Sequence, residues 1–230
     1  MSEFFSEIFT SGSIMQLGLL AGLIASVSYG IVGTLVVARR ISYIAAAIAH
    51  SVLGGIGFAV FCQEHFGWAW FDPLLGAILA AIASALLIGW VSLFLKERED
   101  TIISAVWAIG MSLGVIFLHA SPGFEGGLER FLFGSIIYIE VADIWIQAGL
   151  GLVVVGLSLI FYHKLVAVCF DEEFARLRGV NVPLYFFLLI VLAALCVVLL
   201  VQLAGIVMSI ALIVLPAATG LQFARKLWHG

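Results

Sequence analysis

His50 is the residue with the clearest chemistry in this chain, because it lies well inside a membrane-length apolar segment. It belongs to the stretch Arg39–Gly57, where two arginines end one apolar run and a second run begins almost at once. An ionisable side chain at membrane depth is costly to place, so it is a functional candidate by default. The alternative is a structural histidine that only hydrogen-bonds a neighbouring helix. The residue alone leaves both interpretations open.

Serine hydrolysis is a second chemistry that the residue types allow, with His50 as the base and Ser42, Ser51 or Ser209 as the nucleophile. Ser51 directly follows His50, so the two side chains point in different directions from a helix. The sequence also has no Gly-x-Ser-x-Gly elbow. An intramembrane enzyme is therefore the weaker hypothesis.

The composition decides the class of protein that must position His50. The 230 residues are 64% hydrophobic and 10% charged, whereas soluble domains carry about 25% charged residues. The cysteines are three isolated singles, which predict neither a disulfide framework nor a thiolate metal site. We expect an all-α polytopic membrane protein.

Hydropathy predicts seven transmembrane helices. Residues 1–12 are acidic and aromatic, and we expect them to form an interfacial segment on the bilayer surface. The predicted spans cover residues 14–37, 41–62, 73–95, 101–119, 141–162, 183–201 and 204–222.

The basic residues predict the orientation of these spans. When the gaps between spans are assigned alternately to the two sides, nine of the ten Lys and Arg residues fall on one side, and only Arg130 falls on the other. Cytoplasmic loops carry such an excess of Lys and Arg. We therefore expect the C-terminus to be cytoplasmic.

A charged insert, residues 171–180, interrupts the apolar pattern on the same side. Asp171 suits a helix N-cap, and Gly179 suits the position just after the helix. A short amphipathic helix there would present Phe174 and Leu177 to a groove on a cytoplasmic protein. The alternative is a helical connector without a partner. The sequence has no Gly-x-x-x-x-Gly-Lys-Ser/Thr loop for ATP, so ATP hydrolysis by that route would need another protein.

Two acids begin the predicted fifth span on the outer side. Glu140 and Asp143 are favoured there simply because carboxylates stabilise a helix N-terminus. They also suit an acidic mouth that attracts cations or contacts another protein.

Three stretches together resemble the zinc/manganese/iron group of ABC importer permeases. Residues 40–50 are similar to that family's arginine-led second span, residues 133–135 with 171–180 to its coupling-helix motif, and residues 208–219 to its late Pro-Ala-Ala-Thr span. The resemblance covers most of the chain in order. It implies a single permease domain over residues 1–230, with about seven spans and a short cytoplasmic coupling helix at 171–180.

The resemblance also implies partners and site residues. The chain would act in the bacterial inner membrane as a homodimer or paired permease, with cytoplasmic ATP-binding subunits and a periplasmic or lipid-anchored metal-binding protein. No permanent cofactor, enzymatic activity or nucleic-acid partner is expected, and a divalent metal is the substrate. His50 would lie on the metal path. The residues expected to contact the ATPase are Asp171, Glu172, Phe174, Ala175, Leu177 and Gly179.

Two departures from the family pattern affect these expectations. The family commonly has an aspartate four residues before the histidine, but this chain has Ala46. Because imidazole is compatible with zinc and a path poor in carboxylates disfavours manganese, the sequence favours zinc, then manganese or iron. Family members usually also carry further spans after the Pro-Ala-Ala-Thr segment. The remaining alternatives are a siderophore- or vitamin-type permease and a stand-alone secondary metal carrier.

Overall fold

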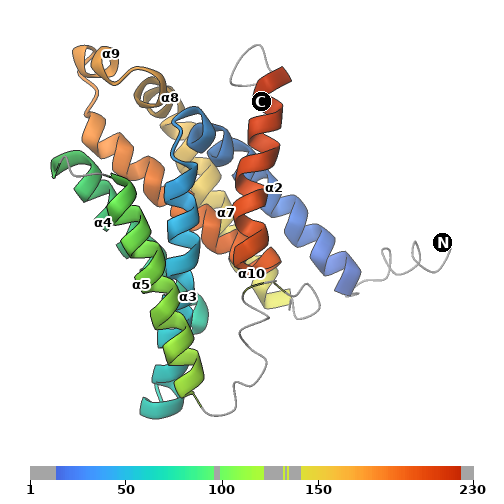
Figure 1. Ribbon diagram of the computed structural model, residues 1–230. Helices are drawn as coiled ribbons and strands as arrows, with labels where there is room; N and C mark the ends of the chain where they lie inside the picture. Colours follow the sequence, from blue (N-terminus) through green and yellow to red (C-terminus); the bar gives the residue numbers. More distant parts are fainter. Residues whose placement is uncertain (1–13, 96–98, 122–131, 133, 135–140, 224–230) are drawn as a thin grey trace.

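The computed structural model describes residues 14–95, 99–121, 132, 134 and 141–223, and these residues form helices and connecting turns without a strand (Figure 1). The predicted all-α class is therefore confirmed. The helices are α2 (Ile14–Ala38), α3 (Ser42–Phe66), α4 (Pro73–Phe94), α5 (Glu99–Ala120), α7 (Val141–Ile160), α8 (Tyr162–Phe170), α9 (Glu172–Leu177) and α10 (Val182–Phe223).

The predicted count of seven spans is not confirmed. Within the described residues, five helices are long and apolar enough to cross a membrane: α2, α3, α4, α5 and α10. A sixth span results if α7 and α8, which meet at a bend of 71°, are counted as one. The predicted interfacial segment 1–12 lies outside the described residues.

The predicted sixth and seventh spans both lie in α10, on either side of Gly205. This glycine has φ 77° and ψ 172°, which is not a helical conformation and is readily adopted only without a Cβ. Gly134 packs directly against the break, where a Cβ on it would lie 2.6 Å from the Gly205 nitrogen. Figure 1 shows the second arm of α10 turning back toward the end of the bundle that carries α8 and α9.

The predicted fifth span, 141–162, is too long at its C-terminal end, because α7 stops at Ile160 and α8 is a separate helix. The side chains of α8 explain the bend. Leu165, Val168 and Cys169 are buried against the bundle, whereas His163, Lys164 and Phe170 are exposed. A helix with one buried and one exposed polar face lies across the end of a bundle more stably than it continues through lipid.

The ends of the central helices follow local sequence signals. Gly67 closes α3 in a left-handed conformation with φ 67°. Asp72 then caps α4, since its carboxylate accepts a hydrogen bond of 2.7 Å from the Leu74 amide, and Pro73 occupies the first helical position.

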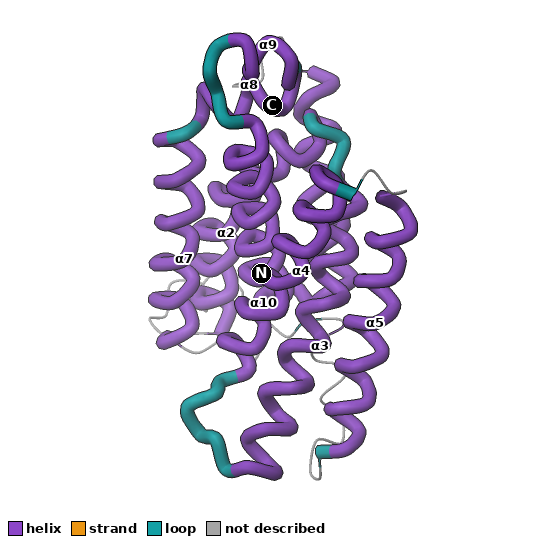
Figure 2. The backbone as a smooth tube through the Cα atoms, turned by 90° about the vertical axis from the view of Figure 1, so that its left-hand side faces the viewer, coloured by secondary structure: helices purple, strands orange, loops and turns teal. Residues whose placement is uncertain are grey.

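Glycines bring α3 into backbone contact with two of its neighbours, α5 and α4, which run alongside it in Figure 2. A Cβ on Gly54 would lie 2.8 Å from the Gly110 carbonyl oxygen, and one on Gly57 would lie 2.7 Å from that of Gly114. Small residues allow such close approach in lipid. We call this contact region the glycine seam; its members are Gly54, Gly55 and Gly57 on α3, Gly76 on α4, and Gly110 and Gly114 on α5.

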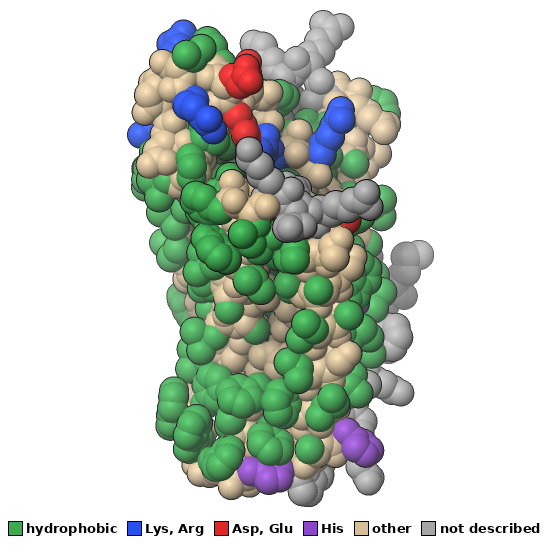
Figure 3. Space-filling view, turned by 60° about the vertical axis from the view of Figure 1, so that its left-hand side comes forward, with side chains coloured by type: hydrophobic (Ala, Val, Ile, Leu, Met, Phe, Trp, Pro, Cys, Tyr) green, Lys and Arg blue, Asp and Glu red, His purple; other side chains and the backbone are tan. Residues whose placement is uncertain are grey.

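Charged side chains gather at one end of the molecule, where α8 and α9 lie, above a surface that is mainly hydrophobic (Figure 3). Five basic residues of the predicted cytoplasmic side are described, and all belong to the α2–α3 turn or to the α8–α9 region: Arg39, Arg40, Lys164, Arg176 and Arg178. Lys96, Arg98, Arg130, Arg225 and Lys226 lie outside the described residues.

Candidate functional site

His50 lies on α3, about two turns after its start, and its ring stacks on Trp107 of α5. The two ring centroids are 4.5 Å apart, and the rings are nearly parallel at 12°. Nδ1 of His50 is buried and has no hydrogen-bond partner within the described part of the chain. The imidazole is thus positioned by stacking, and a ring nitrogen remains available.

Two of the three serines proposed as nucleophiles, Ser51 and Ser209, donate their hydroxyl groups to backbone carbonyl oxygens of their own helices. The Ser51 hydroxyl donates to the Ile48 carbonyl oxygen at 2.8 Å and accepts from the Ser84 hydroxyl of α4 at 2.7 Å. The Ser209 hydroxyl donates to the Ile206 carbonyl oxygen at 2.7 Å. Neither hydroxyl donates to His50, and the geometry therefore gives no support to the hydrolase hypothesis.

Among the described residues, His50 is not accompanied by enough ligands to hold a metal ion. One turn before His50, α3 carries the buried Ala46. Because this residue is an alanine, it offers no carboxylate beside the imidazole. The described residues also contain no group of three or more His, Cys, Asp or Glu side chains that could hold a metal ion. A single imidazole can supply one ligand, whereas a protein-bound zinc or similar ion takes several.

The α9 helix has the local structure that its sequence predicts. The Asp171 carboxylate accepts a hydrogen bond of 2.9 Å from the Phe174 amide. At the other end, Gly179 has φ 75°, and the Val180 amide donates to the Ala175 carbonyl oxygen at 3.0 Å. These bonds satisfy backbone groups that a helix of six residues would otherwise leave without partners.

The residues predicted to contact an ATPase divide into exposed and inward-facing groups. Phe174 is 50% exposed and Leu177 is 88% exposed, as a docking surface requires. Phe170 of α8, which the sequence did not single out, is 64% exposed beside them. Its position just before Asp171 is the signal that could have identified it. Ala175 is fully buried within the chain.

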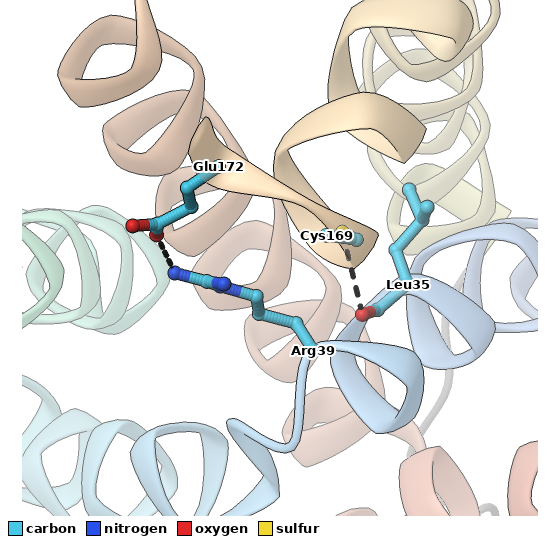
Figure 4. Close-up of polar contacts among 4 residues, drawn as sticks. All are labelled: Leu35, Arg39, Cys169 and Glu172. Carbon is cyan, nitrogen blue, oxygen red and sulfur yellow. Dashed lines mark hydrogen bonds and ion pairs between the residues drawn. The ribbon is translucent and has the colours of Figure 1, made fainter. Parts of the chain in front are cut away.

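Glu172 is also directed inward, and it forms an ion pair with Arg39 at the end of α2 (Figure 4). Asp171 and Gly179 are exposed and have the capping roles described above. The role of the six residues as an ATPase contact stays a prediction.

The two side chains of the predicted acidic mouth fall outside what the structure describes. Glu140 lies outside the described residues, and so does the side chain of Asp143. The outer mouth therefore stays a prediction. Two other histidines are described on α3 and α5: His65 at the end of α3 and His119 at the end of α5 are both exposed.

The helical bundle, with a capped helix at its charged end, has a close counterpart among protein families. Residues 11–229 match the ABC 3 transport family. The chain belongs to the ABC-3 family. The predicted resemblance to metal ABC permeases is thereby confirmed, and the chain is a multi-pass membrane component of an ABC transport system.

The sequence similarity of this ABC-3 protein to named relatives covers most of its length. A protein of Chlamydia pneumoniae named "Probable metal transport system membrane protein" is 38% identical over 208 residues, which are 90% of this chain and 71% of the relative. The manganese transport system membrane protein MntC of Halalkalibacterium halodurans is 29% identical over 224 residues, covering 97% of this chain and 74% of the relative.

A solved structure has the same fold as the ABC-3 chain. PsaBC from Streptococcus pneumoniae in complex with Fab superposes with a TM-score of 0.84 at 28% identity, covering 100% of this chain and 80% of that chain. The similarity therefore extends beyond the short motifs to the whole helical arrangement.

Proposed function

We propose that this chain is the membrane-spanning permease subunit of an ATP-driven importer for manganese(II). The observation that carries the proposal is the match, along 97% of the chain, to a protein named as a manganese transport system membrane protein. This replaces the preference for zinc, which rested on the absence of a carboxylate at Ala46. One missing carboxylate is weak evidence about the metal, because ligands from outside the chain would complete the coordination.

His50 is the residue of this chain that we assign to the manganese path. Its stacking on Trp107 fixes the ring. Its Nδ1, which has no hydrogen-bond partner among the described residues, offers a nitrogen ligand at membrane depth. A single ligand from this chain binds an ion weakly enough to release it, as conduction requires. We infer that a second permease chain or water supplies the remaining ligands.

The charged end is proposed to face the cytoplasm. All five described Lys and Arg residues lie in the α2–α3 turn or the α8–α9 region, and basic residues are enriched on the cytoplasmic side of membrane proteins. Phe174 and Leu177 would then be presented to the ATP-binding subunit, which would carry out all ATP hydrolysis. A metal-binding protein would deliver the ion at the opposite end.

The proposal is tested by reconstituting the permease with its ATPase and metal-binding protein and measuring ATP hydrolysis with manganese(II), zinc(II) or iron(II). We expect the largest stimulation with manganese(II). Stimulation by zinc(II) instead would support the permease assignment and contradict manganese(II) as the substrate. If no free ion stimulates a complex that still contains the ATPase, the importer would carry a chelated ligand. Metal uptake without any bound ATPase would support a stand-alone carrier.

His50→Ala tests the metal path in the same complex. We expect manganese uptake to fall at least about tenfold, because the loss of one ligand removes roughly 1.4 kcal/mol or more of binding. The matched control is His119→Ala, which removes an exposed histidine at the end of α5. Both variants should assemble with the ATPase. Unchanged uptake in His50→Ala would assign His50 a purely structural role.

A further inference from the structure

Arg39 connects three helices through one side chain. Arg39 directly follows Ala38, the last residue of α2. Its Nη2 donates to the Glu172 carboxylate in the first turn of α9. The guanidinium carbon also lies 5.5 Å from the ring centroid of Phe186 on α10. Figure 4 shows the Arg39 side chain extending from the α2 end toward Glu172. The ion pair is partly shielded, since the side chains are 23% and 34% exposed.

The backbone at Arg39 leads directly into the helix that carries His50. The Arg39 amide donates to Leu35 at 2.9 Å, and the Ile41 amide donates to Val36 at 3.0 Å. The turn therefore stays bonded to α2, and α3 begins at Ser42 without a flexible linker. Arg39 is consequently joined by a short, hydrogen-bonded turn to Ser42 at the start of α3, about 12 Å along the helix axis from His50 at 1.5 Å per residue.

The α9 helix faces two ways at this point. Phe174 and Leu177 are exposed on the surface, whereas Glu172 is paired inward with Arg39. The backbone of α9 also packs on α8 and α10, with Ala175 fully buried. The Glu172–Arg39 ion pair thus connects the helix that carries these exposed side chains to the α2–α3 turn.

We propose that Arg39 is a positioning residue that couples α9 to α3, so that movement of α9 during the ATPase cycle repositions the helix bearing His50. This inference rests on the proposed function, in which α9 docks the ATPase. Arginine suits the role because its planar guanidinium can bind a carboxylate and stack on an aromatic ring at the same time. Neither the ABC-3 family match nor the relatives' names assign a role to this pair.

The test compares Arg39→Gln with Arg40→Gln in the complete transporter. Arg40 is the adjacent arginine, is exposed, and equally contributes a positive charge to this end. The measured quantities are the affinity for the ATPase subunit and the manganese(II) transported per ATP hydrolysed. We expect Arg39→Gln to lower the transport ratio about tenfold, within the range of allosteric couplings, and to change the affinity less than about twofold. Arg40→Gln should retain the wild-type ratio.

Variants of Glu172, which lies outside the apolar spans, provide an independent test of the ion pair. Glu172→Gln should reproduce the loss of Arg39→Gln, whereas Glu173→Gln, which removes the neighbouring exposed carboxylate, should not. In the double variant Arg39→Glu/Glu172→Arg, the opposite charges still face each other. Its transport ratio should therefore be at least about threefold higher than that of Arg39→Gln. If Arg39→Gln does not fold, the Glu172→Gln and Glu173→Gln pair decides.

Three results would overturn the inference: a wild-type transport ratio in Glu172→Gln, no recovery in the charge-swapped variant, or a loss of ATPase affinity as large as the loss of transport. The last result would make the ion pair part of the docking surface. Failure of the proposed function is distinguishable, since the wild-type complex itself would then show no manganese-stimulated ATP hydrolysis.

Discussion

The glycine seam and the α9 end of the molecule achieve a fixed structure by opposite means. In the seam, α3 contacts α4 and α5 through positions that have no side chain, such as Gly55 and Gly76. At the α9 end, side-chain interactions fix the structure: Asp171 caps the helix, and Glu172 binds Arg39. The seam is therefore sensitive to added atoms, whereas the α9 end is sensitive to lost ones. This difference suits a rigid membrane portion and, under the proposed function, a surface that docks the ATPase.

The largest effect is expected where α9 exposes apolar side chains. The double variant Phe174→Asp/Leu177→Asp should weaken binding of the ATPase subunit at least about a hundredfold, because central apolar anchors each contribute about 2 kcal/mol or more to an interface. The bundle should remain folded, since both side chains are exposed. Binding is measured by titrating the purified ATPase onto the permease in nanodiscs.

The control for this variant is Leu184→Asp, an exposed leucine near the start of α10. It should leave ATPase affinity within about twofold of wild type, as expected for a residue outside the interface core. An ATPase that still copurifies with the double variant would show that α9 is a connector and that docking occurs elsewhere.

A smaller effect, on stability, is expected from adding one methyl group to the seam. A Cβ on Gly55 would collide with the carbonyl oxygen of Gly76 and would lie 2.8 Å from its carbonyl carbon. Gly55→Ala should therefore lower the free energy of unfolding by about 2–3 kcal/mol. The three cysteines are free and buried, so a thiol-reactive dye reports unfolding of the protein in detergent.

Gly22→Ala is the matched control, because a Cβ at Gly22 on α2 would meet nothing within 4 Å. Its stability should be unchanged or higher by up to about 1 kcal/mol, owing to the better helix propensity of alanine. Equal stabilities of the two variants would mean that α3 and α4 separate easily, and the contrast between the two regions would disappear.

Much of the fold could be predicted from local sequence signals. The all-α class and the capped helix at Asp171 follow from hydropathy and capping chemistry, which depend on neighbouring residues. The boundary between α7 and α8 was missed by two residues, because the apolar run continues past Ile160 to Tyr162 before His163 and Lys164 interrupt it. The side chains that face the bundle decide where the helix turns.

The candidate site was predictable only in part, for a related reason. His50 stands out in the sequence because its position is costly, but its stacking partner Trp107 is one of several aromatic residues in the spans. The Arg39–Glu172 pair joins residues 133 positions apart, so no local pattern reveals it. Under the proposed function, the choice of metal depends on more ligands than His50, and the single difference at Ala46 was too little to determine it.

A still smaller effect is expected from the cap of α9. Asp171→Ala removes the acceptor for the Phe174 amide and should destabilise α9 by about 1 kcal/mol. Hydrogen exchange at the Phe174 amide should therefore be about fivefold faster. Asp171→Asn is the control, since its side-chain oxygen still accepts this bond. Identical exchange in all three proteins would mean that packing on α8 alone fixes the helix.

The smallest effect concerns Arg40, which has a left-handed backbone conformation with φ 62°. A residue with a Cβ pays about 1–2 kcal/mol there, whereas glycine instead loses about 0.5–1 kcal/mol through its greater freedom in the unfolded chain. Arg40→Gly should thus be about 0.5 kcal/mol more stable than Arg40→Ala in the thiol-reactivity assay. Because both variants remove the same charge, the difference isolates the backbone. A less stable Arg40→Gly would show that the turn into α3 is held by its hydrogen bonds to α2 without measurable strain.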